Sequence, residues 1–256
     1  MDLSTRHPTP MPPAIRFQRT LLAACIILAP LSIALYVLAW PENPANVVLN
    51  SSGAAPVVTS QMAGPTGNAL HFVGALAASF FLPLGYLGMS LLGMRRSPWL
   101  ATICAALSLV GWIPWSGLIG IDVLAYDIAQ TGPTPQLDAL WNRFNGDPVM
   151  VAYLLIYVLG HLISAVLIGV MLGRLRLVPI WAAWAFALSS PLNMAYFATH
   201  VVVARYVIRD LIFVLLLAGA IPAALAMLRG DDLAAESASE GAIPGSNPND
   251  RGQRAA

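Results

Sequence analysis

The chain has 256 residues, of which 58% are hydrophobic and only 10% are charged. Soluble domains carry about 25% charged residues, so this composition excludes an ordinary soluble domain and predicts that most of the chain lies in lipid. The net charge of +1 and the lack of a basic stripe along the sequence argue against nucleic acid as a partner. The lipid bilayer is therefore the first partner that the composition predicts.

Six apolar runs of roughly 20 residues follow one another along the chain, and each is long enough to cross a hydrocarbon core of about 30 Å. Backbone groups in lipid have no water to bind, so each run is expected to be helical. The predicted fold class is all-α: a polytopic membrane protein with six transmembrane helices in a bundle. The predicted helices cover Thr20–Trp40, Asn68–Met94, Trp99–Ile121, Val149–Gly173, Ile180 to about His200, and about Tyr206 to Leu228.

The first apolar run follows a basic segment, as in a signal peptide, but it is longer than the usual apolar core of roughly 7–15 residues. We therefore expect an uncleaved first transmembrane helix. Residues 1–19 before it are predicted to be an N-terminal tail. Residues 229–256 contain few large apolar side chains and many Ser, Gly, Asp and Glu, so they are expected to form a disordered C-terminal tail.

Two long polar connections separate the predicted helices, at residues 41–67 and 122–148, and both are predicted to be loops. Within the first, Val47–Leu49 and Val57–Thr59 are a weak candidate for a small hairpin. Within the second, Asp122 to Gln130 is a candidate to continue as an interfacial helix.

Arginine is unevenly distributed between the two sides of the predicted bundle. The two tails hold three each and the short turns at 95–96 and 174–176 hold two each, whereas the two long loops together hold only Arg143. The positive-inside rule then places both termini in the cytoplasm and both long loops outside. Arg205 and Arg209 are exceptions, because the same topology places them outside.

The sequence contains a weak internal pattern. GMRRSPWLA at 93–101 resembles GRLRLVPIWA at 173–182, and three helices share a proline followed two residues later by Ser or Asn. These elements are Pro30-Leu31-Ser32, Pro114-Trp115-Ser116 and Pro191-Leu192-Asn193. Proline bends a transmembrane helix, and three similar bends suggest three tandem helical hairpins. The alternative is chance recurrence of elements that are common in polytopic proteins.

Small residues four apart occur on two of the predicted helices, at Gly74/Ala78, Gly160/Ser164 and Gly169/Gly173. Such ridges let helices approach closely. Packing within one chain is the favoured interpretation, and a homodimer or a contact with another membrane protein is the alternative.

A cluster of ionisable residues stands out between Asn193 and Asp210. It contains His200, Arg205, Arg209 and Asp210, and Asp122 is expected at similar depth on the outer side. One interpretation is a structural salt-bridge corner. The other is a ligand-binding site for a carboxylate or phosphate group, favoured by the arginines and by the start of a helix.

His161 is the most notable single residue, because its helix places it near the bilayer centre, where an ionisable group is a functional hypothesis by default. The alternative is a neutral histidine bonded to a neighbouring helix. His71 and His200 end their helices on the same side, so a metal or haem site between them is a further, weaker hypothesis. Trp99 and Trp181 are expected to anchor the inner interface.

No catalytic group, cofactor site or metal motif can be assembled from the spacing of the remaining residues. Cys25 and Cys104 lie in apolar runs and are interpreted as small buried hydrophobes. No carboxylate is expected deep in a helix, which weakens the case for a proton-coupled pump. An enzymatic role is therefore disfavoured, although the sequence leaves it open.

The segment FFLPLGYLGMSLLGMRRSPWLA at 80–101, after His71 near the helix start, together with GRLRLVPIWAA at 173–183, resembles a group of uncharacterised six-helix bacterial membrane proteins known as a domain of unknown function. The resemblance covers roughly residues 20–228. It implies a bacterial inner-membrane location and no established activity.

The sequence thus favours a permease-like protein or an accessory subunit that binds a small or lipidic anion at its outer face. One alternative is a structural or sensory component that acts through a partner protein docked on the C-terminal tail. Another is a membrane-embedded haem or metal protein, or an enzyme, that uses His71, His161 and His200.

Overall fold

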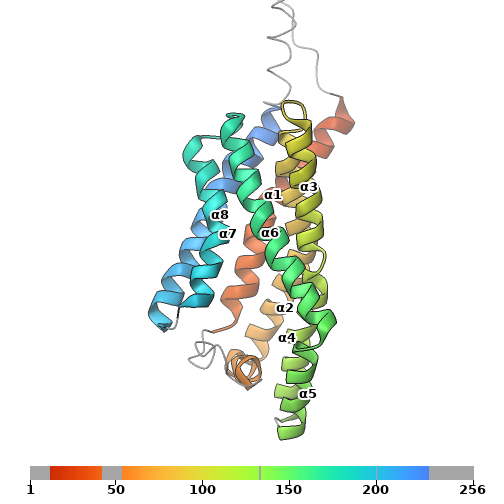
Figure 1. Ribbon diagram of the computed structural model, residues 1–256, viewed down its shortest axis with the longest axis vertical. Helices are drawn as coiled ribbons and strands as arrows, with labels where there is room; N and C mark the ends of the chain where they lie inside the picture. The colour runs from red at the N-terminus through yellow and green to blue at the C-terminus, as the bar shows by residue number, and fades with distance from the viewer. Residues whose placement is uncertain (1–11, 42–53, 133, 200, 231–256) are drawn as a thin grey trace, which may run out of the picture.

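The computed structural model describes residues 12–41, 54–132, 134–199 and 201–230 (Figure 1). Within these ranges the chain is helical, with eight α-helices and no strand. The helices are α1 (Pro13–Ala39), α2 (Ala54–Leu92), α3 (Pro98–Trp112), α4 (Trp115–Thr131), α5 (Pro135–Asn145), α6 (Pro148–Arg174), α7 (Ile180–Ala198) and α8 (Val202–Arg229). Most of the predicted N-terminal tail and nearly all of the predicted C-terminal tail lie outside the described residues.

Several helices begin earlier than the hydropathy pattern predicts, because they begin at a proline. Helix α1 starts at Pro13, not at Thr20, so part of the predicted N-terminal tail is helical. Helices α3, α5 and α6 also have proline in the first turn. Proline suits this position because its φ is already helical and the missing N–H would have no intrahelical partner.

The prediction that residues 41–67 form a loop is wrong over its second half. Helix α2 begins at Ala54 and includes Val57–Thr59, so the hairpin suggested for these residues is excluded; its other strand lies outside the described residues. A kink at Gly64, with φ 63°, separates this first segment from the long part of α2. A positive φ is easily reached only by glycine, and Pro65 after it lacks an N–H. In Figure 1 the first segment is seen end-on, across the long axis.

Asn68 holds this kink. Its side-chain amide donates to the carbonyls of Ser60 and Gly64 at 2.9 and 2.8 Å, and its oxygen accepts from the Ser60 hydroxyl and from Trp40 Nε1. Asn68 is buried, so these bonds replace the water that a kinked backbone would otherwise need.

The prediction that residues 122–148 form a loop is also wrong for most of its length. Helix α4 continues to Thr131, which confirms the helix suggested from Asp122 onward. Helix α5 then occupies Pro135–Asn145, and its N-terminus is capped by the Thr134 hydroxyl, which accepts from Leu137 N. Trp141 of α5 packs with Val57, Ala125 and Ile128 in a small second core below the main one.

Five stretches of the described chain are long and apolar enough to cross a membrane, which indicates a multi-pass membrane protein. They correspond to α1, most of α2, the combined α3 and α4, α6 and α8. The sequence predicts six spans, and five of them meet this criterion of length and hydropathy. The predicted span that does not meet it is the fifth, α7, which is long enough but contains Ser189, Ser190 and Asn193.

The long helices lie side by side along the long axis of the molecule (Figure 1). Helix α1 contacts α2, α2 contacts α3, α3 contacts α6, α6 contacts α7, α7 contacts α8, and α8 contacts α1. The contacts therefore close into a ring. The pairs that contact most extensively are α1 with α2, α7 with α8 and α3 with α6, which are the three hairpins of the predicted tandem pattern.

Glycines let these helices meet at backbone distance. A Cβ on Gly74 would lie 2.4 Å from the Tyr36 nitrogen of α1, and a Cβ on Gly160 would lie 2.5 Å from the Gly111 Cα of α3. Gly169 approaches α7 in the same way. The predicted small-residue ridges thus pack helices within one chain, as the favoured interpretation held.

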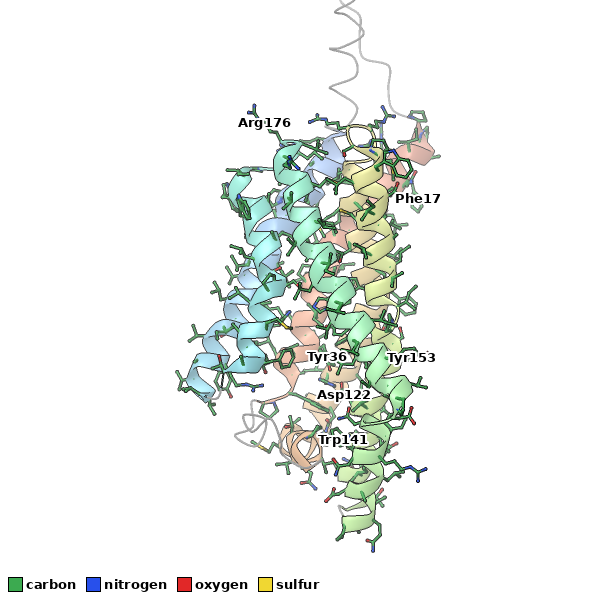
Figure 2. All side chains as sticks on the ribbon, viewed as in Figure 1. Phe17, Tyr36, Asp122, Trp141, Tyr153 and Arg176 are labelled. Atoms are coloured by element: carbon green, nitrogen blue, oxygen red, sulfur yellow. The ribbon has the colours of Figure 1, made fainter. Side chains whose placement is uncertain are left out.

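The start of α1, the α2–α3 and α6–α7 turns and the end of α8 meet at the upper end in Figure 1. Arg19 of α1 donates to the Met227 carbonyl of α8 at 3.1 Å, and Arg96 of one turn donates to the Leu175 carbonyl of the other. We call this the arginine end. The opposite end carries α5 and the junction of α7 and α8, and Figure 2 shows Asp122 and Trp141 near it.

Candidate functional site

A cavity of about 600 Å³ lies among the long helices, between their middle and the end opposite the arginine end. All six long helical stretches contribute to its wall, so it is formed only when the ring of helices closes. Its volume is in the range of pockets that hold small organic ligands, about 300–1,000 Å³. We call it the central cavity.

Aromatic side chains form much of the wall of the central cavity, and a few polar groups lie among them. The aromatic residues are Tyr36, Trp40, Tyr86, Trp112, Trp115, Tyr157, Tyr196, Phe197 and Phe213. The polar and charged residues are Thr59, His71, His161, Ser189, Ser190, Asn193 and Arg209. A mainly apolar wall with a few polar groups is typical of a ligand-binding pocket.

The cavity exists because α6 and α7 are in close contact only near the arginine end. There Gly169 and Gly173 of α6 lie against α7. Farther down, α7 contains Pro191, which cannot donate an intrahelical bond. Figure 1 shows the two helices closer near their connection than at their far ends.

The mouth of the cavity is apolar. Leu154 of α6 and Met194 and Phe197 of α7 line the cavity, yet 45%, 38% and 55% of their surfaces are exposed. A side chain that is both lining and exposed lies where the cavity meets the outside. The mouth therefore lies between α6 and α7, on side chains suited to lipid contact.

The aromatic rings form a continuous series from the outer part of the cavity to its depth. Trp40 stacks on His71 with ring centroids 3.8 Å apart, and Tyr36 contacts both His71 and Trp115. Trp115 then contacts Tyr157 at 5.4 Å. These contacts hold the rings in fixed orientations, since aromatic pairs favour particular geometries. The inner rings continue the series, with Tyr157 stacked on His161 at 4.4 Å and Trp112 5.2 Å from His161.

His161 lies midway along α6 and is buried, and its hydrogen bond defines which ring nitrogen carries the proton. Its Nδ1 is 2.6 Å from the Tyr157 carbonyl oxygen. A carbonyl oxygen only accepts, so Nδ1 carries the hydrogen, and in the neutral ring Nε2 is an acceptor. That Nε2 atom is buried and has no hydrogen-bond partner among the described residues.

Three donors on the same cavity wall share this condition. Trp112 Nε1, Trp115 Nε1 and the Ser190 hydroxyl are buried and make no hydrogen bond within the described part of the chain. Buried polar groups normally have partners, and one left unpaired costs roughly 1–3 kcal/mol. Four such groups around one cavity can form hydrogen bonds to whatever fills it, whether water or a ligand.

A second polar group closes the outer part of the cavity wall. The Tyr36 hydroxyl donates to Asp122 Oδ2 at 2.6 Å, and His71 Nε2 lies 3.4 Å from the same oxygen. His71 Nδ1 is 2.8 Å from the Tyr36 carbonyl oxygen and must donate to it. The Nε2–Oδ2 contact then needs one proton, carried by the ring or by the carboxyl group. These contacts tie together α1, α2 and α4.

The predicted arginine cluster is present on the first turns of α8. Arg205 is buried with its guanidinium 4.3 Å from the Tyr196 ring centroid, and Arg209 lies 4.7 Å from the Tyr206 ring centroid. Two nitrogens of Arg209 donate to Asp210 at 3.1 Å. Of the three ionisable residues, Arg209 lines the central cavity. The cluster is therefore an aromatic-supported corner with one arginine at the cavity wall.

The structure joins some of the predicted site residues and separates others. His161 and Arg209 line the same cavity. Asp122 does not line it, but it contacts Tyr36 and His71, which do. His200 lies outside the described residues, so its predicted pairing with His71 stays a prediction. Both ring nitrogens of His71 face protein oxygens, which leaves neither directed at a metal.

The inner aromatic residues were not predicted as site residues. The sequence shows Trp112, Trp115 and Tyr157 as helix residues only, and a substrate cage built from such rings had no support in the pattern. These three side chains come together at one cavity wall only when α3, α4 and α6 pack against one another. The low hydropathy of α7 was the usable signal, because Ser189, Ser190 and Asn193 all line the cavity.

Comparison with protein-family models, curated proteins and solved structures finds no match for this chain. The resemblance to an uncharacterised six-helix family accordingly stays a prediction.

Proposed function

We propose that the protein is a permease-like protein or an accessory subunit of the bacterial inner membrane, and that its central cavity binds a small or lipidic anion from the outer face. The observation that carries this proposal is the combination of Arg209 with an aromatic, largely apolar cavity whose mouth is apolar. An anionic head joined to an apolar body matches both parts of that wall.

Six membrane crossings support this proposal better than five. Helix α7 lies between α6 and α8 in the ring of contacts and has no charged residue. Its polar residues face the cavity instead of lipid, which explains why a helix of low mean hydropathy can cross a bilayer. Six crossings also return the end of α8 to the side where α1 begins.

The orientation follows from charge. Arg16, Arg19, Arg95, Arg96, Arg174, Arg176 and Arg229 belong to the segments that meet at the arginine end. The positive-inside rule favours the cytoplasm for that end. The central cavity then faces the opposite, outer side of the membrane.

The arginines of α8 supply the charge complement for an anion. Arg205 and Arg209 lie one turn apart, and Asp210 is the acidic residue beside them. Arg209 is paired with Asp210, and Arg205 adds a second positive charge against Tyr196, which lines the cavity. Arginine also binds carboxylate and phosphate groups with two parallel hydrogen bonds, which favours an anion of that shape at Arg209.

The test is anion-dependent thermal stabilisation of the purified protein in detergent. We expect 3-phenylpropionate to raise the unfolding midpoint, whereas the neutral 3-phenylpropionamide leaves it unchanged. Arg209→Gln should abolish the shift. Arg143→Gln, an exposed arginine on α5, is the matched control and should keep it.

A lipidic source of the anion is distinguished by a second pair of probes. Dihexanoyl phosphatidate should stabilise the protein more than dihexanoylglycerol if the ligand is a lipid. Uptake of labelled 3-phenylpropionate into reconstituted vesicles would separate a permease from an accessory subunit. An Arg209→Gln variant that responds to both anions like the wild type would overturn the proposed site.

A further inference from the structure

The depth of the central cavity has a hydrogen-bonding character of its own, separate from the charge at Arg209. His161 Nε2 is an acceptor, and Trp112 Nε1 and Trp115 Nε1 are donors. All three atoms are buried and have no partner among the described residues, and all three residues line the cavity. We call these three residues the inner polar site.

The three side chains are held together and cannot easily turn to other partners. The His161 ring is fixed by its bond to the Tyr157 carbonyl and by stacking on the Tyr157 ring. Trp112 contacts His161 at 5.2 Å and Trp115 at 6.4 Å between ring centroids. At most 7% of the surface of any of the three residues is exposed. The unsatisfied atoms are therefore a fixed feature of the cavity.

The chemistry of the guest follows from the mixture of donors and an acceptor. A group that only accepts, such as a ketone or a carboxylate, would satisfy the tryptophans and leave His161 Nε2 unpaired. A group that only donates would do the reverse. A hydroxyl group both donates one hydrogen bond and accepts others, so it can serve both kinds of atom at once.

The surroundings define the body that carries this hydroxyl. Aromatic rings surround the inner polar site, and offset or edge contacts with another ring are favourable there. An aliphatic chain would forgo those contacts.

We infer that the cavity binds a hydroxylated cyclic anion, with its hydroxyl at the inner polar site and its acidic group toward Arg209. This inference rests on the proposed function and names the substrate class of the same site. Its distinguishing claim is that the ligand's hydroxyl, not only its charge, is recognised.

The experiment compares ligands that differ by the hydroxyl alone. Binding of 3-(4-hydroxyphenyl)propionate and 3-phenylpropionate to the detergent-purified full chain is measured by equilibrium dialysis. We expect the hydroxylated probe to bind about tenfold more tightly, or about 1.4 kcal/mol, because its hydroxyl makes hydrogen bonds that the unsubstituted ring cannot make. The neutral 4-ethylphenol should bind more weakly, and Arg209→Gln should not affect it.

Two variants locate the recognition. His161→Phe keeps an aromatic ring but removes the acceptor, and should reduce the hydroxyl preference to below twofold. Trp112→Phe keeps a ring and removes a donor, and should reduce it partly, which covers the case that His161→Phe does not fold. Leu188→Ala, at an exposed residue of α7 that is not among the cavity-lining residues, should leave the preference intact.

The outcomes separate this inference from the proposed function. Equal binding of the two propionates, with Arg209 still required, overturns hydroxyl recognition and means that water satisfies the inner polar site. A preference that survives both His161→Phe and Trp112→Phe also overturns it. Failure of both propionates to bind at millimolar concentration overturns the proposed anion site together with it.

Discussion

At the residue scale, Asp122 is the group whose role differs most from expectation. It was expected to balance the arginines of α8 at the outer surface, but it accepts from Tyr36 and lies against His71. Its side chain is 17% exposed, so a carboxylate predicted to be at the water boundary is largely enclosed. It therefore joins three helices at the outer wall of the cavity.

Replacing Asp122 should release this junction. Asp122→Ala leaves the Tyr36 hydroxyl and His71 Nε2 without their partner, and we expect it to lower the free energy of unfolding by about 1–2 kcal/mol. Asp122→Asn should recover part of the loss, because an amide oxygen at the Oδ2 position can still accept from the Tyr36 hydroxyl. Asp127→Ala, on the exposed face of the same helix, should change stability by less than about 0.5 kcal/mol. Thermal unfolding followed by tryptophan fluorescence measures all three, and equal effects at positions 122 and 127 would refute the junction.

Single residues could be predicted only where their chemistry is local. His161 was singled out because an ionisable side chain in an apolar run is unusual, and this needs no knowledge of its neighbours. The partners of Asp122 could not be predicted, because Tyr36 and His71 are distant in sequence and meet it only through helix packing.

At the scale of elements, the contact between α3 and α6 depends on two glycines that face each other. Gly160→Ala would place a Cβ 2.5 Å from the Gly111 Cα, where backbone must move to make room. We expect a loss of about 1–3 kcal/mol of stability, the usual cost of overpacking. Gly120→Ala is the matched control, because nothing lies within 4 Å of its Cβ, and helix propensity then favours alanine.

Chemical denaturation of the two glycine variants in the same detergent tests this difference. A Gly160→Ala protein as stable as Gly120→Ala would mean that α3 and α6 are not in backbone contact. The Gly160 result also bears on the cavity, because His161 is the next residue and a displaced α6 would move its ring.

The sequence predicts a helix wherever a long apolar run alone requires one. It does not predict the residues at which these helices begin and end. The apolar runs of α1, α6 and α8 were recognised, but Pro13 was assigned to the N-terminal tail because it precedes the first apolar run. Helix α5 was missed because it is short and amphipathic. Its signals were present: Thr134 as cap, Pro135 in the first turn, and Asp138 and Arg143 near the ends that suit their charge.

At the scale of the whole molecule, the central cavity could not be predicted from the sequence. Its wall combines residues from Ile33 to Leu216, and each side chain is unremarkable within its own helix. The hydropathy pattern shows that a helix is apolar, but not which side faces lipid and which faces a neighbour. The cavity arises because α6 and α7 diverge on the side of Gly169 away from their connection, and this divergence depends on how the two helices pack.

The orientation of the molecule gives the last prediction. Arginine placement predicts that the arginine end is cytoplasmic and that α5 is outside. Gln18 of α1 and Gln136 of α5 are exposed at these opposite ends. The free cysteines Cys25 and Cys104 are buried, so alanine at both positions provides a cysteine-free background. A single cysteine is then introduced by Gln18→Cys or Gln136→Cys, neither of which alters an arginine.

A membrane-impermeant maleimide should label Gln136→Cys in intact cells and Gln18→Cys only after the membrane is broken. The reverse pattern would invert the orientation and turn the cavity toward the cytoplasm, which would make the proposed anion a cytoplasmic ligand. Labelling of both positions in intact cells would show that these two ends lie on one side of the membrane, and would contradict crossing by the helices between them. The pattern of labelling therefore decides from which side any ligand reaches Arg209.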